Sequence, residues 1–189
     1  MRQIARSRFL SDAELDAFMR AVRERKHRNA ARDHAFFAIL ANLGLRPSEV
    51  LALEAADVHV HAHPPWLRVT RKKKRTAVPD DIQITGELAN IVARHVYASS
   101  PPRAGRVFPF GARAAQRLFH LYASRSCIFK PTILYILRHT AATRIYRLTK
   151  DIGLVQAMLG HESADTSALY AHLSRAVVAE AVSAIAPIV

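Results

Sequence analysis

Apolar residues recur at helical spacing from the beginning of the chain. Between residues 11 and 26 they fall three or four positions apart, at Leu15, Phe18, Met19 and Val22. Ser11 and Glu14 have the spacing of a capping box, in which each side chain bonds the backbone of the other residue. The pattern therefore predicts an amphipathic helix over residues 11–26.

Two further helices are predicted directly after this one. Apolar residues follow the helical period from Ala30 to Leu43. Gly44 is the expected stop, because glycine readily adopts the left-handed conformation that ends many helices. Pro47 suits the first turn of a short third helix, which we expect to end near Leu53.

The pattern changes character between residues 59 and 79. Residues 66–70 and 76–79 resemble strands, and the basic run Arg71-Lys72-Lys73-Lys74-Arg75 lies between them. We therefore expect a small antiparallel hairpin with this run at its tip. Helices are predicted at 85–98, 111–124, 132–148, 151–159 and 163–173. A last apolar stripe at helical spacing comprises Leu173, Val177, Val178, Ala181, Val182 and Ile185. The fold class is mainly α with a small antiparallel β-sheet (α+β).

Composition narrows the class of partner. Half of the 189 residues are hydrophobic, which fits one domain with its own core. The formal net charge is +13, from 28 Lys and Arg against 15 Asp and Glu, and indicates a polyanionic partner, nucleic acid ahead of membrane. The alternative is a protein that is merely basic and has no polyanionic partner. The lack of an apolar membrane span or signal segment and the single cysteine, Cys127, favour a cytoplasmic location.

Four residues could hold and attack a phosphodiester. Arg46 lies between a helix stop and a helix start, where a side chain can project into a cleft. Arg138 lies within an apolar helix, where a buried guanidinium needs either a salt bridge or a phosphate as its partner. His161 and Tyr170 follow 23 and then 9 residues later. Each could alone be structural, but their order and spacing together favour phosphodiester chemistry.

These segments resemble the tyrosine recombinases of the phage integrase family. The similarity extends from about Ser11 to Leu173 and is strongest over 42–53 and 137–173. It implies that Arg46 and Arg138 are catalytic arginines, that His161 binds the phosphate and that Tyr170 is the nucleophile. It also implies a supporting role for Glu49. No cofactor, metal or small-molecule substrate is implied.

The same resemblance places a catalytic lysine on the hairpin. Counting forward from Val69 assigns this position to Lys72, whereas counting back from Pro79 assigns it to Arg71. We select Lys72 as the general acid. DNA-binding phosphate contacts are expected from Arg71, Lys73, Lys74 and Arg75.

One position departs from the family pattern. The family commonly has a histidine three residues before the second arginine, and this chain has Tyr135. A phenol titrates near 10, so it is a poor base at neutral pH. Either a weaker proton acceptor serves Tyr170, or His139 or water helps, or activity is reduced. Tyr135 and His139 are therefore supporting candidates.

The expected organisation is a single catalytic domain over residues 1–189, with residues 174–189 as a helical tail. The DNA-clamping domain that usually comes first in the family is not expected, because catalytic-type sequence begins by about residue 9. The resemblance implies a homo-tetramer on double-stranded DNA, linked through the tail, with a cytoplasmic, nucleoid-associated location.

The predicted function is site-specific DNA recombination through a 3′-phosphotyrosyl intermediate. One alternative is a non-catalytic, regulatory DNA-binding member of the same fold. The other is a basic helical nucleic-acid-binding module without strand transfer. His59, His61 and His63 alternate as metal ligands on a strand would, but no cysteine or carboxylate cluster accompanies them. A solvated or DNA-facing loop is therefore the preferred interpretation of this segment.

Overall fold

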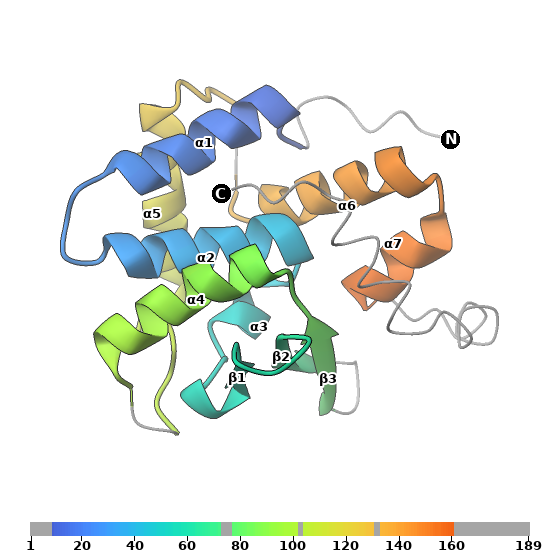
Figure 1. Ribbon diagram of the computed structural model, residues 1–189. Coiled ribbons are helices and arrows are strands. Elements are labelled where there is room, and N and C mark those ends of the chain that lie inside the picture. Colours follow the sequence, from blue (N-terminus) through green and yellow to red (C-terminus); the bar gives the residue numbers. More distant parts are fainter. Residues whose placement is uncertain (1–8, 73–76, 102–103, 131–132, 161–189) are drawn as a thin grey trace.

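The computed structural model describes residues 9–72, 77–101, 104–130 and 133–160 (Figure 1). Its helices and strands are α1 (Asp12–Glu24), α2 (Ala30–Leu43), α3 (Pro47–Val50), the 3-10 turn η2 (Ala55–Asp57), β1 (Val58–His59), β2 (Trp66–Lys72), β3 (Ala77–Gln83), α4 (Gly86–Ser99), α5 (Ala112–Arg125), α6 (Ile136–Thr149) and α7 (Ile152–Leu159). The predicted class, mainly helical with a small antiparallel sheet, is confirmed. The predicted helix at 163–173 and the last apolar stripe lie outside the described residues.

Local signals in the sequence set the ends of the first two helices. Ser11 caps α1, and its hydroxyl and the Glu14 carboxylate bond each other's backbone as the capping box requires. Gly44 ends α2 in the left-handed conformation with a φ of 59°, and its N–H donates to the Leu40 carbonyl. Both of these end signals were predicted correctly.

Two helix boundaries differ from the predictions by three residues or more. The third helix ends at Val50 rather than Leu53, although turn hydrogen bonds continue to residue 53. The helix predicted at 132–148 begins only at Ile136. Before it, the N–H of Ile136 bonds the carbonyl of Ile133, three residues back, in a turn too tight for an α-helix. Apolar periodicity alone does not distinguish such turns from helix.

The three strands form an antiparallel sheet in the order β1-β2-β3. In the hairpin, Trp66 pairs with Gln83 and Lys72 pairs with Ala77, so the strands extend further than predicted. Leu67 and Val69 are fully buried, whereas the intervening Arg68 is exposed. Side chains alternate along a strand, so the odd positions of β2 face the helices.

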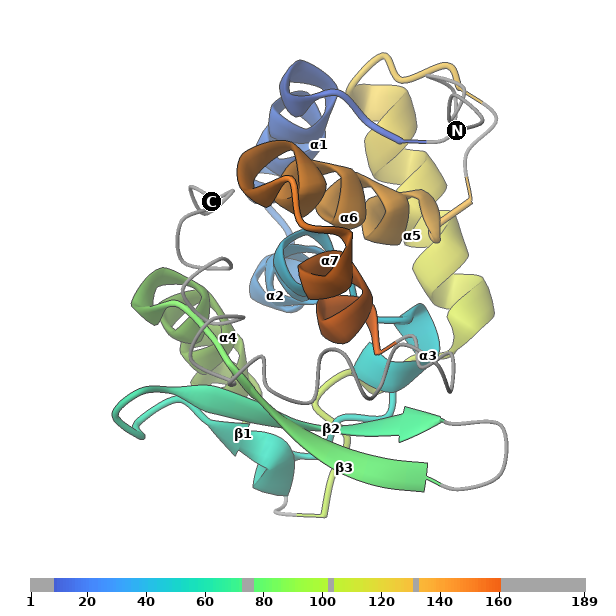
Figure 2. The same ribbon diagram turned by 90° about the vertical axis from the view of Figure 1, so that its right-hand side faces the viewer.

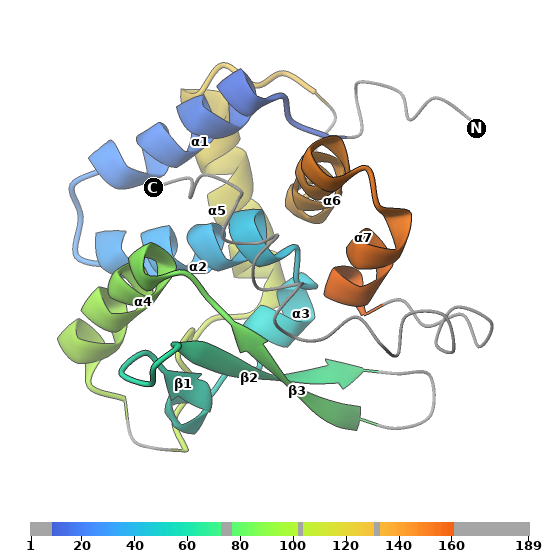
Figure 3. The ribbon, with the colours of Figure 1, turned by 45° about the vertical axis from the view of Figure 1, so that its right-hand side comes forward.

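The α-helices lie on one face of this sheet, and α7 lies beside α3 above the hairpin (Figures 2 and 3). An aromatic cluster joins α1, α2 and α5 in the core, through Phe18, Phe36, Phe37, Phe119 and Tyr122. The Tyr122 hydroxyl donates to the buried Asp33 carboxylate at 2.8 Å, which links α5 to α2. These contacts hold α2, whose C-terminal end leads to Arg46, against α1 and α5.

Candidate active site

Arg46 and Glu49 form a local unit at the start of α3. Arg46 is the residue before Pro47 and has an extended backbone, so its N–H has no partner within the helix. The Glu49 carboxylate accepts from this N–H at 2.8 Å and from the Arg46 Nη1 at 2.9 Å. Glu49 is 2% exposed. The Glu49 carboxylate therefore orients both the backbone and the side chain of Arg46 directly.

Arg138 connects the ends of two helices. Its guanidinium is 2% exposed and donates from Nη1 to the Gly44 carbonyl and from Nη2 to the Leu159 carbonyl, both at 2.8 Å. These carbonyls lie at the C-terminal ends of α2 and α7, where backbone acceptors lack partners within the helix. The sequence suggested a salt bridge or a phosphate as the partner of this buried charge, and its partners in the structure include backbone carbonyls. The contact also ties Gly44, two residues before Arg46, to the end of α7.

Electrostatic neighbours of Arg138 identify the rest of the cluster. Burial lowers the pKa of its guanidinium, while Tyr135 opposes this shift. The positive charges of Arg46 and Arg71 lower it further, and the negative charge of Glu49 raises it. Segments that are far apart in the sequence therefore converge on one site.

Arg71 lies inside this site, although it was predicted at the hairpin tip. It belongs to β2, pairs with Val78 and is 5% exposed. Its Nε donates to the Asp80 carboxylate at 3.2 Å, and its Nη2 donates to the Met158 carbonyl at 2.9 Å. Position 71 shares the parity of the two buried positions before it, so the side chain faces the helices.

Tyr135, the N-cap residue of α6, and His139, within α6, lie beside Arg138. The Arg138 Cζ is 5.8 Å from the centre of the Tyr135 ring. The rings of Tyr135 and His139 meet edge to face, with their centres 5.4 Å apart. Both supporting candidates therefore lie near the arginine cluster.

The other predicted site residues lie at the edge of the residues that the structure describes or outside them. Lys72 ends β2 opposite Ala77, and its side chain is not among the described parts. Outside the described residues lie Lys73, Lys74, Arg75, His161 and Tyr170. The described chain ends at Gly160, the residue before His161. The structure thus brings together Arg46, Glu49, Arg71 and Arg138.

Sequence reasoning missed Asp80 and the helix-end carbonyls. Asp80 lies on β3 opposite Val69, diagonally across from Arg71. The register of the hairpin could have indicated this pair, because diagonal neighbours on one face of a sheet are within reach of long side chains. No signal in the sequence marks the carbonyls of Gly44, Met158 and Leu159, since every residue carries such a group.

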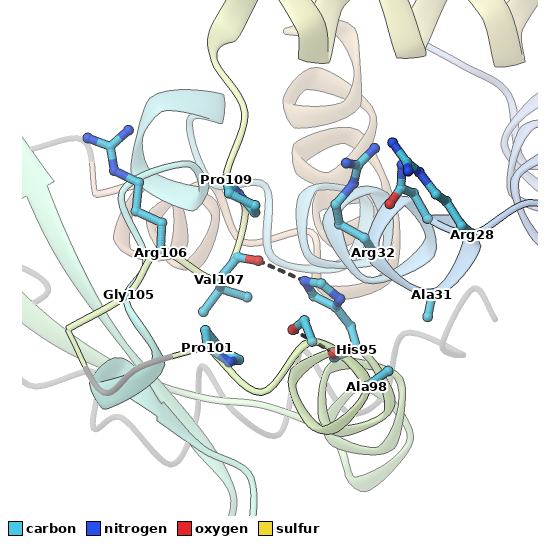
Figure 4. Close-up of a pocket in the computed structure, with 12 residues that line it drawn as sticks. Arg28, Ala31, Arg32, His95, Ala98, Pro101, Gly105, Arg106, Val107 and Pro109 are labelled. Atoms are coloured by element: carbon cyan, nitrogen blue, oxygen red, sulfur yellow. Dashed lines mark hydrogen bonds between the residues drawn. The ribbon is translucent and has the colours of Figure 1, made fainter.

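A separate pocket of about 520 Å³ lies at the other end of α2 (Figure 4). The His95 Nε2 and the Val107 carbonyl are 2.7 Å apart within it, and burial lowers the pKa of His95. Three arginines contribute to its lining, namely Arg28, Arg32 and Arg106. None of the predicted site residues lines this pocket.

Two further features bear on ligands and location. The ring of His59, in the edge strand β1, stacks on the ring of Trp66 in β2, with the ring centres 3.6 Å apart. Among the residues that the structure describes, no three His, Cys, Asp or Glu side chains are grouped to hold a metal ion. No helix of the described part is both long and apolar enough to cross a bilayer.

Similarity to known proteins shows the family of this chain. The profile of the phage integrase family matches residues 8–176. The chain belongs to the phage integrase family. The tyrosine recombinase XerD of Lacticaseibacillus casei is 33% identical over 180 residues, which cover 87% of this chain and 58% of the relative. Tyrosine recombinases named XerC, from Neisseria species, match over 76% of this chain and 48% of their own length. The chain spans about half the length of these curated relatives.

Solved structures share the fold of this family member. The XerH site-specific recombinase bound to its difH substrate superimposes with a TM-score of 0.72 at 19% identity, over 89% of this chain and 51% of that one. The XerA recombinase gives a TM-score of 0.71 at 22% identity, over 95% of this chain and 64% of that one. These likenesses support the mainly helical architecture and the place of the small sheet in it.

Proposed function

We propose that this chain is the catalytic part of a site-specific recombinase that cuts and rejoins DNA through Tyr170. The observation that carries the proposal is the convergence of Arg46, Glu49 and Arg138. Arg46 and Arg138 come from distant parts of the chain, yet Arg138 bonds the Gly44 carbonyl, two residues before Arg46, and the positive charge of Arg46 lowers the pKa of Arg138. Two guanidinium groups oriented in this way suit the non-bridging oxygens of a phosphodiester.

The proposed reaction is a balanced exchange of phosphodiester bonds. The Tyr170 oxygen attacks the phosphorus and gives up its proton to His139 or water, while the bond to the 5′-oxygen breaks. A 3′-phosphotyrosyl link forms, and the departing 5′-oxygen takes a proton from Lys72. Arg46, Arg138 and His161 stabilise the charge on the non-bridging oxygens. Rejoining reverses these steps with a new 5′-hydroxyl, so no cofactor is required.

The partner that we propose is double-stranded DNA. The net charge of +13 supports a polyanionic ligand, and the hairpin run that includes Lys73, Lys74 and Arg75 would contact the phosphate backbone. The Tn1549 transposon integrase, which shares this fold, was solved in complex with transposon right end DNA. We further propose a homo-tetramer on DNA linked through residues 174–189, and a nucleoid-associated location in the cytoplasm.

Covalent trapping on DNA tests the nucleophile. We expect the wild-type chain to form a denaturation-resistant adduct on nicked duplexes drawn from the genome next to its gene. Tyr170→Phe should abolish the adduct but keep DNA binding, because the hydroxyl contributes little surface. Tyr97→Phe is the matched control, since Tyr97 is 59% exposed on α4, away from the site. A Tyr170→Phe protein that still forms the adduct would refute the assignment.

A non-catalytic, regulatory DNA-binding protein of the same fold is the second candidate. The observation in its favour is Tyr135, which stands where the family commonly has a histidine. This alternative predicts DNA binding by the wild type with no adduct on any nicked duplex. A nucleic-acid-binding module without strand transfer predicts in addition that Tyr170→Phe changes no property of the protein.

Alanine and lysine substitutions test whether Arg46 and Arg138 bind the phosphate through their planar guanidinium groups. Arg46→Ala and Arg138→Ala should each lose transition-state stabilisation of roughly 3–4 kcal/mol in trapping. Lysine at either position should restore little of the rate, because the planar fork is lost. Arg138 also binds two helix ends, so its variants need a denaturation curve beside the rate. Folded lysine variants with wild-type rates would contradict bidentate phosphate binding.

The general acid is tested with a modified leaving group. Lys72→Ala should slow cleavage more than the same change at Lys73 or Lys74. A substrate with sulfur at the 5′-bridging position should restore the Lys72→Ala rate, because that leaving group needs no proton. Rescue at Arg71 instead would move the assignment along the hairpin.

A further inference from the structure

We propose that Arg71 is a third arginine of the phosphate site and binds a non-bridging oxygen of the scissile phosphate through its Nη1. This inference rests on the proposed function, which it extends by one residue that contacts the substrate. The proposal concerns a side chain that was expected to contact DNA backbone from the hairpin tip. The structure instead buries it beside the two arginines of the site.

Two contacts fix the orientation of the Arg71 guanidinium. Nε donates to the Asp80 carboxylate on the neighbouring strand, and Nη2 donates to the Met158 carbonyl at the end of α7. A guanidinium is planar, so two such bonds from two different nitrogens leave it little freedom to turn. The direction of the third nitrogen, Nη1, is therefore determined before any ligand arrives.

The third nitrogen has no hydrogen-bond partner. Nη1 is buried, and a carboxylate oxygen of Glu49 lies 3.6 Å away from it. This distance is too long for a hydrogen bond, although the opposite charges still attract. The Glu49 oxygens are already occupied by Arg46. A buried donor without an acceptor is rare in folded proteins and calls for a ligand or another explanation.

The charges of the described cluster leave room for one anion. Three guanidinium groups, those of Arg46, Arg71 and Arg138, face two carboxylates, those of Glu49 and Asp80. One positive charge is therefore left over among these side chains, and a phosphodiester carries one negative charge. Without Arg71 the same group would be neutral before DNA binds.

Arg71 also lies against the backbone that leads to the remaining predicted catalytic residues. A Cβ added to Gly160 would lie 3.3 Å from the Arg71 Cζ. Gly160 is followed directly in the chain by His161. An anion held by Arg71 would consequently sit next to the start of the segment that carries the proposed histidine and nucleophile.

The first experiment uses inorganic phosphate and does not depend on recombination. We would measure the midpoint of thermal unfolding in phosphate and in chloride at equal ionic strength. For a site with a Kd of about 10 mM, 100 mM phosphate should raise the wild-type midpoint by about 4 °C. Arg71→Gln should lose most of this rise. No rise in the wild type, or an equal rise in Arg71→Gln, would overturn the proposal.

Arg68→Gln is the matched control. Arg68 lies on the same strand and also binds a carboxylate, that of Asp81, at 2.8 and 3.1 Å, but on the exposed face. The control therefore removes one charge and one hairpin ion pair without touching the site. It should keep the full rise in phosphate, and a loss equal to that of Arg71→Gln would refute a specific role for Arg71.

The second experiment compares trapping on two DNA substrates. On the ordinary phosphodiester, Arg71→Gln should be slower than wild type by about 100-fold. On a neutral methylphosphonate at the scissile position, the gap should shrink below about tenfold, because one less negative charge needs stabilisation. An equal gap on both substrates would show that Arg71 only positions other groups. Arg71→Lys keeps the charge, so its rate on the phosphodiester should fall between those of wild type and Arg71→Gln.

The outcomes separate this inference from the proposed function. If wild type forms no adduct but binds phosphate through Arg71, the recombinase proposal fails while the anion site stands. If wild type forms the adduct and both Arg71 variants match it, only the third arginine is refuted. If neither Arg71→Gln nor Arg71→Lys folds, the residue belongs to the fold alone, and the inference is likewise refuted.

Discussion

Replacement of Gly44 by alanine should destabilise the protein and disturb the site together. Gly44 ends α2 with a φ of 59°, a conformation that residues with a Cβ rarely adopt. An added Cβ would lie 3.2 Å from the side chains of Ala141, Met158 and Leu159. Its carbonyl also accepts the Nη1 of Arg138. One methyl group would therefore meet both α6 and α7 at the point where Arg138 joins them to α2.

The cost follows from two independent terms. The left-handed conformation costs a residue with a Cβ about 1–2 kcal/mol. Overpacking of a filled core costs about 1–3 kcal/mol, and the Ala141 Cβ cannot yield without movement of α6. The end of the Met158 side chain can move, which favours the lower half of that range. We expect Gly44→Ala to lower the free energy of unfolding by about 2–4 kcal/mol.

Denaturant unfolding at equilibrium measures this change. Gly86→Ala is the control, because a Cβ there meets nothing within 4 Å and the residue lies in the first turn of α4. Alanine should leave that site unchanged or stabilise it by up to about 1 kcal/mol. A Gly44→Ala protein within about 0.5 kcal/mol of wild type would refute the reasoning, since neither strain nor overpacking could then be present.

Three further predictions follow from other parts of the chain. Tyr135→His should retain or raise the trapping rate, because imidazole titrates near neutrality, and a large loss in a folded variant would show that the site depends on the phenol. Burial, aided by Arg23 and Arg94, lowers the pKa of His34 to about 4, so stability should fall as pH drops from about 6.5 toward 4. His34→Gln should weaken that dependence in denaturation curves at pH 7 and 5, and an unchanged slope would contradict it. Deletion of residues 175–189 should spare DNA binding but abolish higher-order complexes in gel-shift and sizing experiments, and an unfolded truncation would instead place the tail in the core of its own chain.

The sequence by itself determined the helical architecture and the motif arginines. The capping box at Ser11 and the stop at Gly44 act within a few residues, so they can be recognised without the rest of the fold. The segment around Arg138 predicted a buried charge that needs partners, because an apolar helix excludes water from it. Periodicity was least reliable at the ends of α3 and α6, where turns replace helix.

Only the tertiary structure decided which side chains complete the site. The run from Arg71 to Arg75 looks uniformly basic, and a shift of one residue in strand register would exchange the buried and exposed faces. The observed register turns Arg71 inward to Asp80 and the end of α7. Likewise, Arg138 finds the carbonyls of Gly44 and Leu159 because α2, α6 and α7 pack together. These contacts join residues that are far apart in the chain, so no local pattern could have predicted them.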